Sequence, residues 1–373
     1  MTRLRILLVS FVVLVSSVAY ASHRGARAAG VLLRFGGDES SELARYDREA
    51  FETVDLPIST DGRRIENRVY RPRGASRGAI VLVHGMHRDG HLEGRLVALA
   101  KSFAAAGVEV WTPRIESLAS FSLRTEAIDD VRIAASSMAT ARGVDAVPVF
   151  GISFAGGIAL IAASDRVAGA SIASVVTLGA HDDLARVARW FAGDEASGPN
   201  GESVSVRPHP YGAQLFLGED PARFFGAENE TVVRELIGLV LRDDWRTARA
   251  RSSELSPHGR VVLENAIAGR LDETTRSELR AMIDERSRDL AALSPHALVR
   301  DLRIPVLILH GAEDPIVPAT EARHLATALP DATVLVTSAL RHAENADDAS
   351  LEEKLALVRF VDQVLRLAAD ADG

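Results

Sequence analysis

Residues 147–157 read VPVFGISFAGG. The apolar run at Val147–Gly151 is typical of a strand buried on both faces, and the segment Phe154–Ala163 has the length and apolarity of a buried helix. Ser153 lies on the turn between them, with small residues two positions away on either side. Such a serine is typical of a nucleophile elbow, where small neighbours let the helix pack close to the turn. The usual pattern has glycine at both places, and Ala155 replaces the second one here.

The sequence on both sides of this turn alternates between short apolar runs and segments with helical spacing. This alternation predicts a doubly wound α/β fold with a mostly parallel sheet, whose strands present their C-termini at one edge. A hairpin is predicted around Asp61-Gly62. The predicted strands are Ala79–Val83, Val108–Trp111, Val147–Gly151, Ala173–Leu178, Pro305–His310 and Thr333–Val336, and the predicted helices of the core are Leu96–Ala106, Ile128–Thr140, Phe154–Ala163 and Leu351–Ala368.

The first 21 residues have the composition of a secretory signal. Arg3 and Arg5 precede an apolar run that ends in the small-residue motif Ala19-Tyr20-Ala21, which predicts cleavage after residue 21. An uncleaved signal anchor is the alternative, in which residues 6–21 would associate with a membrane, although roughly 17–25 residues are needed to span one. Both interpretations predict an extracytoplasmic protein, either secreted or periplasmic, or held at the membrane by its N-terminus.

The rest of the chain is interpreted as one α/β core with a large insertion. Residues 22–50 are rich in glycine and arginine without sustained periodicity and are interpreted as a spacer. The core is assigned to residues 51–181 and 303–373, and residues 182–302 are expected to form a helical lid above the catalytic edge. Leu-Ser-Pro-His occurs at residues 255–258 and 293–296, and each copy predicts a serine N-cap followed by proline in the first turn. The predicted lid helices are Thr231–Leu241, Val261–Ala268 and Glu273–Leu290.

A serine nucleophile needs a base, and the base needs an acid that orients it. In this type of fold the order along the chain is serine, acid, histidine. Asp314 follows the strand at Pro305–His310, and His342 follows the next strand, so Ser153, Asp314 and His342 are the predicted catalytic residues. Two alternatives for the acid stay open: Glu313 is the nearest, and Asp182 with Asp183 is the second.

The oxyanion of a tetrahedral intermediate needs two N–H donors. We assign them to the backbone of Phe154 and of Met86, with His87 as the alternative to Met86. His84, His87 and His91 resemble a metal cluster, but a histidine at a strand end more often makes structural hydrogen bonds, and no His-Glu-x-x-His helix is present. No metal and no cofactor are therefore expected.

Together, Val81–Met86, Gly151–Gly157, the loop Gly311–Pro318 and His342 resemble the α/β-hydrolase superfamily, and the lidded branch of serine esterases, lysophospholipases and serine aminopeptidases is most similar. The resemblance covers about Phe51–His181 and Arg303–Asp370. It implies a Ser-His-Asp triad acting through an acyl-enzyme. A serine nucleophile argues against the haloalkane-dehalogenase and epoxide-hydrolase branches, which use aspartate.

These features predict a serine hydrolase that cleaves a carboxylic ester, including lipid-like acyl esters, with a small-molecule acyl substrate as its partner. A serine aminopeptidase, an acyltransferase and a binding module without turnover are the alternatives. The chain has 43 basic and 51 acidic residues, a net charge of −8, which argues against nucleic-acid binding. It has no cysteine, which excludes disulfides, thiolate metal sites and cysteine nucleophiles.

Overall fold

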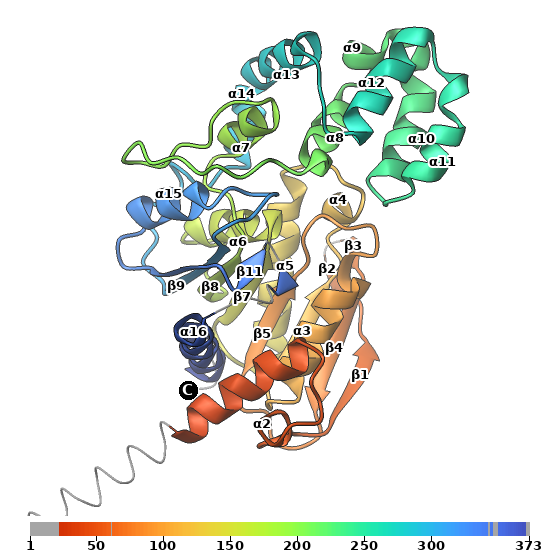
Figure 1. The fold of residues 1–373 in the computed structure, drawn as a ribbon. Coiled ribbons are helices and arrows are strands. Elements are labelled where there is room, and N and C mark those ends of the chain that lie inside the picture. Colours follow the sequence, from red (N-terminus) through yellow and green to blue (C-terminus); the bar gives the residue numbers. More distant parts are fainter. Residues whose placement is uncertain (1–21, 61, 342–343, 346–349, 371–373) are drawn as a thin grey trace, which may run out of the picture.

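The computed structural model describes residues 22–60, 62–341, 344–345 and 350–370, and in them an eight-stranded sheet lies at the centre of the molecule (Figure 1). Its strand order is β1-β4-β6-β5-β7-β8-β9-β10. β4 runs antiparallel to β1 and β6, and the remaining neighbours are parallel, which confirms the predicted fold class. The strands are β1 (Phe51–Asp55), β4 (Asn67–Pro72), β5 (Ala79–Val83), β6 (Glu109–Pro113), β7 (Val147–Ile152), β8 (Ile172–Leu178), β9 (Val306–Gly311) and β10 (Thr333–Thr337).

Alternate residues of each central strand enter two different hydrophobic cores, which explains why these strands are apolar throughout. In β5, Val81 and Val83 belong to one core, and Ile80 and Leu82 to the other. Successive side chains of a strand point to opposite faces, so both faces of the sheet are covered. The first core includes α5 (Glu126–Arg142), α6 (Phe154–Ser164) and α15 (Thr320–Ala328), and the second includes α3 (Gly94–Ala104) and α16 (Leu351–Asp370).

The predicted hairpin is confirmed by β2 (Ile58–Thr60) and β3 (Arg63–Ile65), which pair antiparallel. Asp61 itself lies outside the described residues. The strand pairing also accommodates Pro148, because the register between β7 and β8 shifts between Val147 and Pro148. A proline lacks the N–H of a ladder hydrogen bond and is tolerated at such irregularities.

The interpretation of residues 22–50 as a spacer is wrong, because residues 22–35 form a helix, here called the N-terminal helix. Figure 1 shows it in red beside α16, and a short helix, α2 (Glu42–Arg45), follows it. Ala28 and Val31 are buried in the second core, and Arg24 donates two hydrogen bonds to Asp362 of α16. Glycine and arginine obscured the apolar spacing of this helix, whose stability comes from tertiary packing.

Residues 1–21, and with them the predicted signal, lie outside the described residues. Within the part of the chain that the structure describes, no helix combines the length and apolarity needed to cross a bilayer.

The insertion is helical, as predicted, and lies above the C-terminal edge of the parallel strands (Figure 1). The predicted helix Glu273–Leu290 is interrupted at Arg286. Trp190, Phe191 and Phe216 are buried, and they belong to the first core, which continues from the sheet into the insertion. The lid helices are α7 (Leu184–Phe191), α8 (Pro210–Glu219), α9 (Pro221–Phe225), α10 (Glu230–Val240), α11 (Trp245–Ala250), α12 (Pro257–Ile267), α13 (Glu273–Glu285) and α14 (Ser287–Ala292).

Only the first Leu-Ser-Pro-His segment begins a helix. Ser256 caps α12 by accepting a hydrogen bond from the N–H of Gly259. The same prediction for the second segment is wrong, because residues 293–300 form turns. Ser294 instead joins two lid helices: its Oγ donates to the carbonyl of Leu290 and accepts from the N–H of Leu184.

A buried ionic cluster anchors the lid to the core. Arg186 of α7 bonds to Glu321 of α15 at 2.6 Å and to Asp182 at 2.9 Å. Glu321 is fully buried, and its Oε2 also accepts the backbone N–H groups of Asp182 and Asp183. The Nδ1 of His296 lies 2.9 Å from Asp182 Oδ2. The Glu321 carboxylate of the core therefore binds the first turn of the lid in two ways, through backbone N–H groups and through the side chain of Arg186.

We expect Glu321→Gln to lower the free energy of unfolding by about 2 kcal/mol, because Arg186 and two backbone N–H groups lose a charged acceptor while Asp182 still pairs with Arg186. Urea denaturation would measure this loss. Glu352→Gln, at an exposed position of α16, is the control. An equal effect of the two substitutions would show that the cluster does not stabilise the fold.

Candidate active site

Ser153 lies on a strained turn between β7 and α6, as the sequence predicts. Its backbone has φ 57° and ψ −131°, a region that residues with a side chain rarely occupy. The N–H of Ser153 donates to the carbonyl of Leu178 at 2.7 Å, which ties the turn to the end of β8. Ser153 therefore lies just beyond the end of β7, at the edge of the sheet where the parallel strands end.

The small residues around Ser153 are required by close contacts. A Cβ atom on Gly151 would lie 2.4 Å from the carbonyl oxygen of Ala155, and one on Gly157 would lie 2.3 Å from the ring of His181. Neither distance is compatible with van der Waals packing. These glycines allow α6 to begin directly behind the serine.

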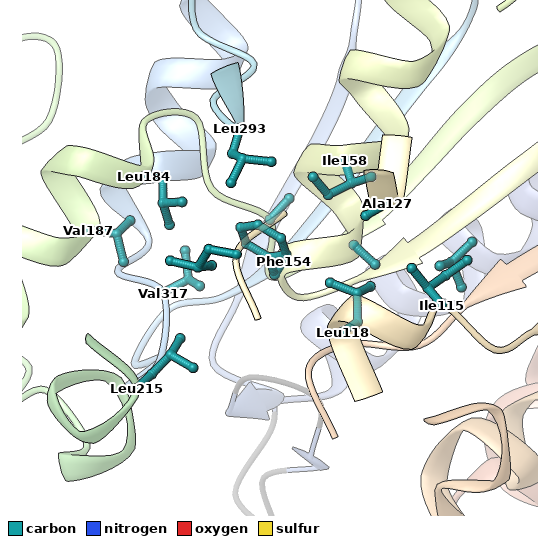
Figure 2. Close-up of a cluster of buried hydrophobic side chains, with 14 of the residues drawn as sticks. Ile115, Leu118, Ala127, Phe154, Ile158, Leu184, Val187, Leu215, Leu293 and Val317 are labelled. Carbon is teal, nitrogen blue, oxygen red and sulfur yellow. The ribbon is translucent and has the colours of Figure 1, made fainter. Parts of the chain in front are cut away.

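The side chain of Phe154 fixes the position of the residue that follows the serine. Its ring stacks on His181, with centroids 5.0 Å apart. Figure 2 shows Phe154 among Leu184, Val187 and Val317, so the lid and the loop after β9 enclose it. This packing holds the backbone of Phe154 at the start of α6.

The loop after β5 is braced by His84. This side chain is buried, its Nε2 accepts the N–H of Ile115 at 3.0 Å, and its Nδ1 donates to the carbonyl of Gly85 at 2.7 Å. Burial lowers the pKa of His84 to about 4, so the ring is neutral at pH 7. The structure therefore favours the structural interpretation of His84 over metal binding. Among the described residues, no group of three or more histidine, aspartate or glutamate side chains is arranged to hold a metal ion.

Holding the Gly85 carbonyl also orients Met86, because this carbonyl and the Met86 N–H belong to one planar peptide unit and point in opposite directions. The loop lies next to the serine, since a Cβ atom on Gly85 would be 3.1 Å from Ser153 Cβ. Neither the Met86 N–H nor the Phe154 N–H has a hydrogen-bond partner among the described residues. Both are therefore available as donors.

Asp314 is fully buried in the loop after β9. Its Oδ1 accepts the N–H groups of Ile316 at 2.7 Å and Val317 at 2.9 Å, which fixes the carboxylate, and its Oδ2 lies 3.6 Å from His310 Nε2. The rival Glu313 is exposed. The other two alternatives for the catalytic acid have partners in the lid. Asp182 belongs to the ionic cluster, and Asp183 caps α7 by accepting two backbone N–H groups.

The predicted base, His342, lies outside the described residues, so the structure does not place it. The short strands β11 (Leu340–Arg341) and β12 (Glu344–Asn345) flank it and pair with each other. β11 lies against β9, the strand that leads to Asp314.

Ser153 opens into a cavity of about 470 Å³ between the core and the lid. The lining is mostly apolar and aromatic. Phe35 of the N-terminal helix lines one side. This contribution was missed because the helix was interpreted as a spacer, although the apolar residues Ala28, Val31, Leu32 and Phe35 have helical spacing. Lid residues that line the cavity include Phe191, Tyr211, Leu215, Phe216, Leu241 and Asp243.

Backbone strain is concentrated around this cavity. Four non-glycine residues among the described ones have positive φ, and three of them line the cavity: Phe121 (57°), Ser153 (57°) and Asp243 (61°). Phe121 and Asp243 follow the ends of α4 (Glu116–Ala119) and α10, where glycine is usual. Strained positions of this kind are typical of functional sites.

His84 predicts a dependence of stability on pH. Because its pKa is about 4 in the folded protein and about 6.5 when unfolded, the unfolded chain binds the proton more tightly. The free energy of unfolding should therefore fall as the pH falls from 6.5 towards 4, with a contribution from His84 of up to about 1.4 kcal/mol per pH unit. In His84→Asn this slope should become shallower. Urea denaturation between pH 4.5 and 7 tests the prediction, and identical slopes in both proteins would contradict it.

The chain matches a family model and has similarity to several solved structures. Residues 80–350 match the model of the alpha/beta hydrolase family. Acylaminoacyl peptidase from Pyrococcus horikoshii is 13% identical with a TM-score of 0.48, over 85% of this chain and 41% of that one. Dienelactone hydrolase from Anabaena variabilis is 13% identical with a TM-score of 0.43, over 84% and 96%. This chain thus spans about two fifths of the peptidase. No curated protein matches the sequence. The family match over most of the chain shows that it belongs to the alpha/beta hydrolase family.

Proposed function

We propose that the protein is a serine hydrolase that cleaves carboxylic esters with an apolar acyl group. The observation that carries this proposal is the position of Ser153, on a strained turn, opening into a mostly apolar cavity of about 470 Å³. Apolar cavities with few polar groups suit acyl chains.

In the proposed reaction, Ser153 Oγ attacks the ester carbonyl while His342 accepts its proton. The N–H groups of Met86 and Phe154 stabilise the oxyanion. His342 then donates the proton to the leaving alcohol, and water, activated by the same histidine, releases the acid from the acyl-enzyme. Asp314, held by two backbone N–H groups, orients the imidazole.

A serine aminopeptidase is the second candidate, and Asp243 is the observation that favours it. It lines the cavity and has no ion-pair partner among the described residues, so it could hold a substrate ammonium group. Two other acids of the lid are engaged: Glu230 pairs with Arg234, and Asp244 caps α11. An ester is preferred because the cavity is otherwise predominantly apolar. With an alcohol or amine in place of water, the same residues would perform acyl transfer.

The composition of residues 1–21 supports an extracytoplasmic location as part of this proposal.

We expect a fluorophosphonate probe to label the protein from residue 22 onward, and we expect hydrolysis of chromogenic esters with an optimum at one chain length. Ser153→Ala should abolish labelling and lower hydrolysis by at least about 10³-fold. Aminoacyl anilides tested in parallel distinguish the aminopeptidase, and product analysis with an added alcohol distinguishes the transferase. Equal labelling of both proteins would exclude Ser153 as the nucleophile.

Asp314→Asn should lower kcat by roughly 10³–10⁴-fold, because the amide no longer stabilises the imidazolium or its tautomer. Asn can still accept the two backbone N–H groups, so circular dichroism should show an unchanged fold. Glu313→Gln is the matched control in the same loop and should retain near-normal kcat. A loss in the control with none in Asp314→Asn would assign the acid to Glu313.

A further inference from the structure

The first residues of lid helix α8 contact two loops of the candidate active site. The N–H of His209 donates to the carbonyl of Pro315 at 2.8 Å, next to Asp314. The Oη of Tyr211 donates to the carbonyl of Met86 at 3.3 Å, in the loop proposed to bind the oxyanion. The lid is therefore bonded to the acid loop and to the oxyanion loop within three residues of its own sequence.

Tyr211 is held rigidly at this position. His209 caps α8 by accepting the N–H of Tyr211, and Pro210 occupies the first turn. The ring of Phe121 packs edge-on against that of Tyr211, with centroids 6.3 Å apart. Burial raises the pKa of Tyr211, so its hydroxyl remains protonated and can donate throughout the ordinary pH range.

The hydrogen bonds of His84 and Tyr211 act on the two peptide units that flank the Cα of Met86. His84 holds the Gly85 carbonyl from the core, and Tyr211 holds the Met86 carbonyl from the lid. Each peptide unit is planar, so fixing both restricts φ and ψ of Met86 together. The direction of the Met86 N–H then depends on one residue of the core and one residue of the lid.

We propose that Tyr211 is a positioning residue that makes the oxyanion hole depend on the seated lid. This inference rests on the proposed function, in which the Met86 N–H binds the oxyanion. With the lid in place, both carbonyls are held and the donor is preorganised. Without the hydroxyl, the Met86–His87 peptide loses its lid-side partner and the donor is aimed less accurately.

Tyr211→Phe tests the proposal, because it removes the hydroxyl and keeps the ring against Phe121. We expect kcat to fall about tenfold with KM within a factor of two, since the effect arises in the transition state. Removing an oxyanion donor itself costs roughly 10²–10³-fold, so an indirect brace should cost less. The affinity for a trifluoromethyl ketone, which mimics the tetrahedral intermediate, should fall by the same factor as kcat. Tyr70→Phe, a buried tyrosine of β4 outside the cavity lining, is the matched control and should change neither value.

Hydrogen exchange provides a readout that does not need turnover. Amides of residues 84–92 should exchange faster in Tyr211→Phe than in the wild type, and at the wild-type rate in Tyr70→Phe. Unchanged exchange with unchanged kcat would overturn the proposal, and a raised KM with unchanged kcat would make Tyr211 a substrate contact instead. If the fluorophosphonate does not label the wild type, the proposed function fails, whereas hydrogen exchange still decides whether Tyr211 braces the loop.

Discussion

The strained backbone at Ser153 is the constraint on which the rest of the structure depends. A serine with positive φ persists only where its surroundings determine its conformation. Three features determine it here. The Ser153 N–H bonds to the end of β8, and the missing side chain of Gly151 lets the helix begin directly behind the turn. The ring of Phe154 is enclosed between the core and the lid. Relaxing the turn would therefore separate β7 from α6 and open the cluster that surrounds Phe154.

The lid covers the cavity and also contacts the segments of the core that surround Ser153. Its first turn is held by the carboxylate of Glu321. Its last segment is held by His181, which stacks on Phe154 and whose Nε2 lies 2.8 Å from the carbonyl of Leu293. Its middle reaches the two loops through His209 and Tyr211. Lid and core thus share contacts around the serine, so the proposed chemistry and the position of the lid are linked.

Local sequence patterns predicted the strands of the sheet and the turn at Ser153 well, because the local preferences of these segments agree with the tertiary structure. β5 has the predicted bounds, and Ser153 lies on the predicted strand-turn-helix. The failures occur where tertiary contacts override local signals. The N-terminal helix needs α16 and the sheet to bury Ala28 and Val31, and Ser294 bonds to Leu184 from a distant part of the chain instead of capping a helix. The hydrogen bond between Asp182 and His296 likewise joins residues distant in sequence, although its bond with Arg186 spans one helical turn.

The sequence by itself determined the family, the order of the parallel strands, and the candidate residues Ser153, Asp314 and His342, because strand periodicity, turn chemistry and motif order are local properties. Tertiary structure alone decided which polar groups meet. It joined Asp182 to His296 across the lid, made His84 a buried neutral side chain that holds the loop after β5, and brought Phe35 and Tyr211 to one cavity. These outcomes depend on long-range packing and burial, which set hydrogen-bond partners and pKa values and leave no local pattern.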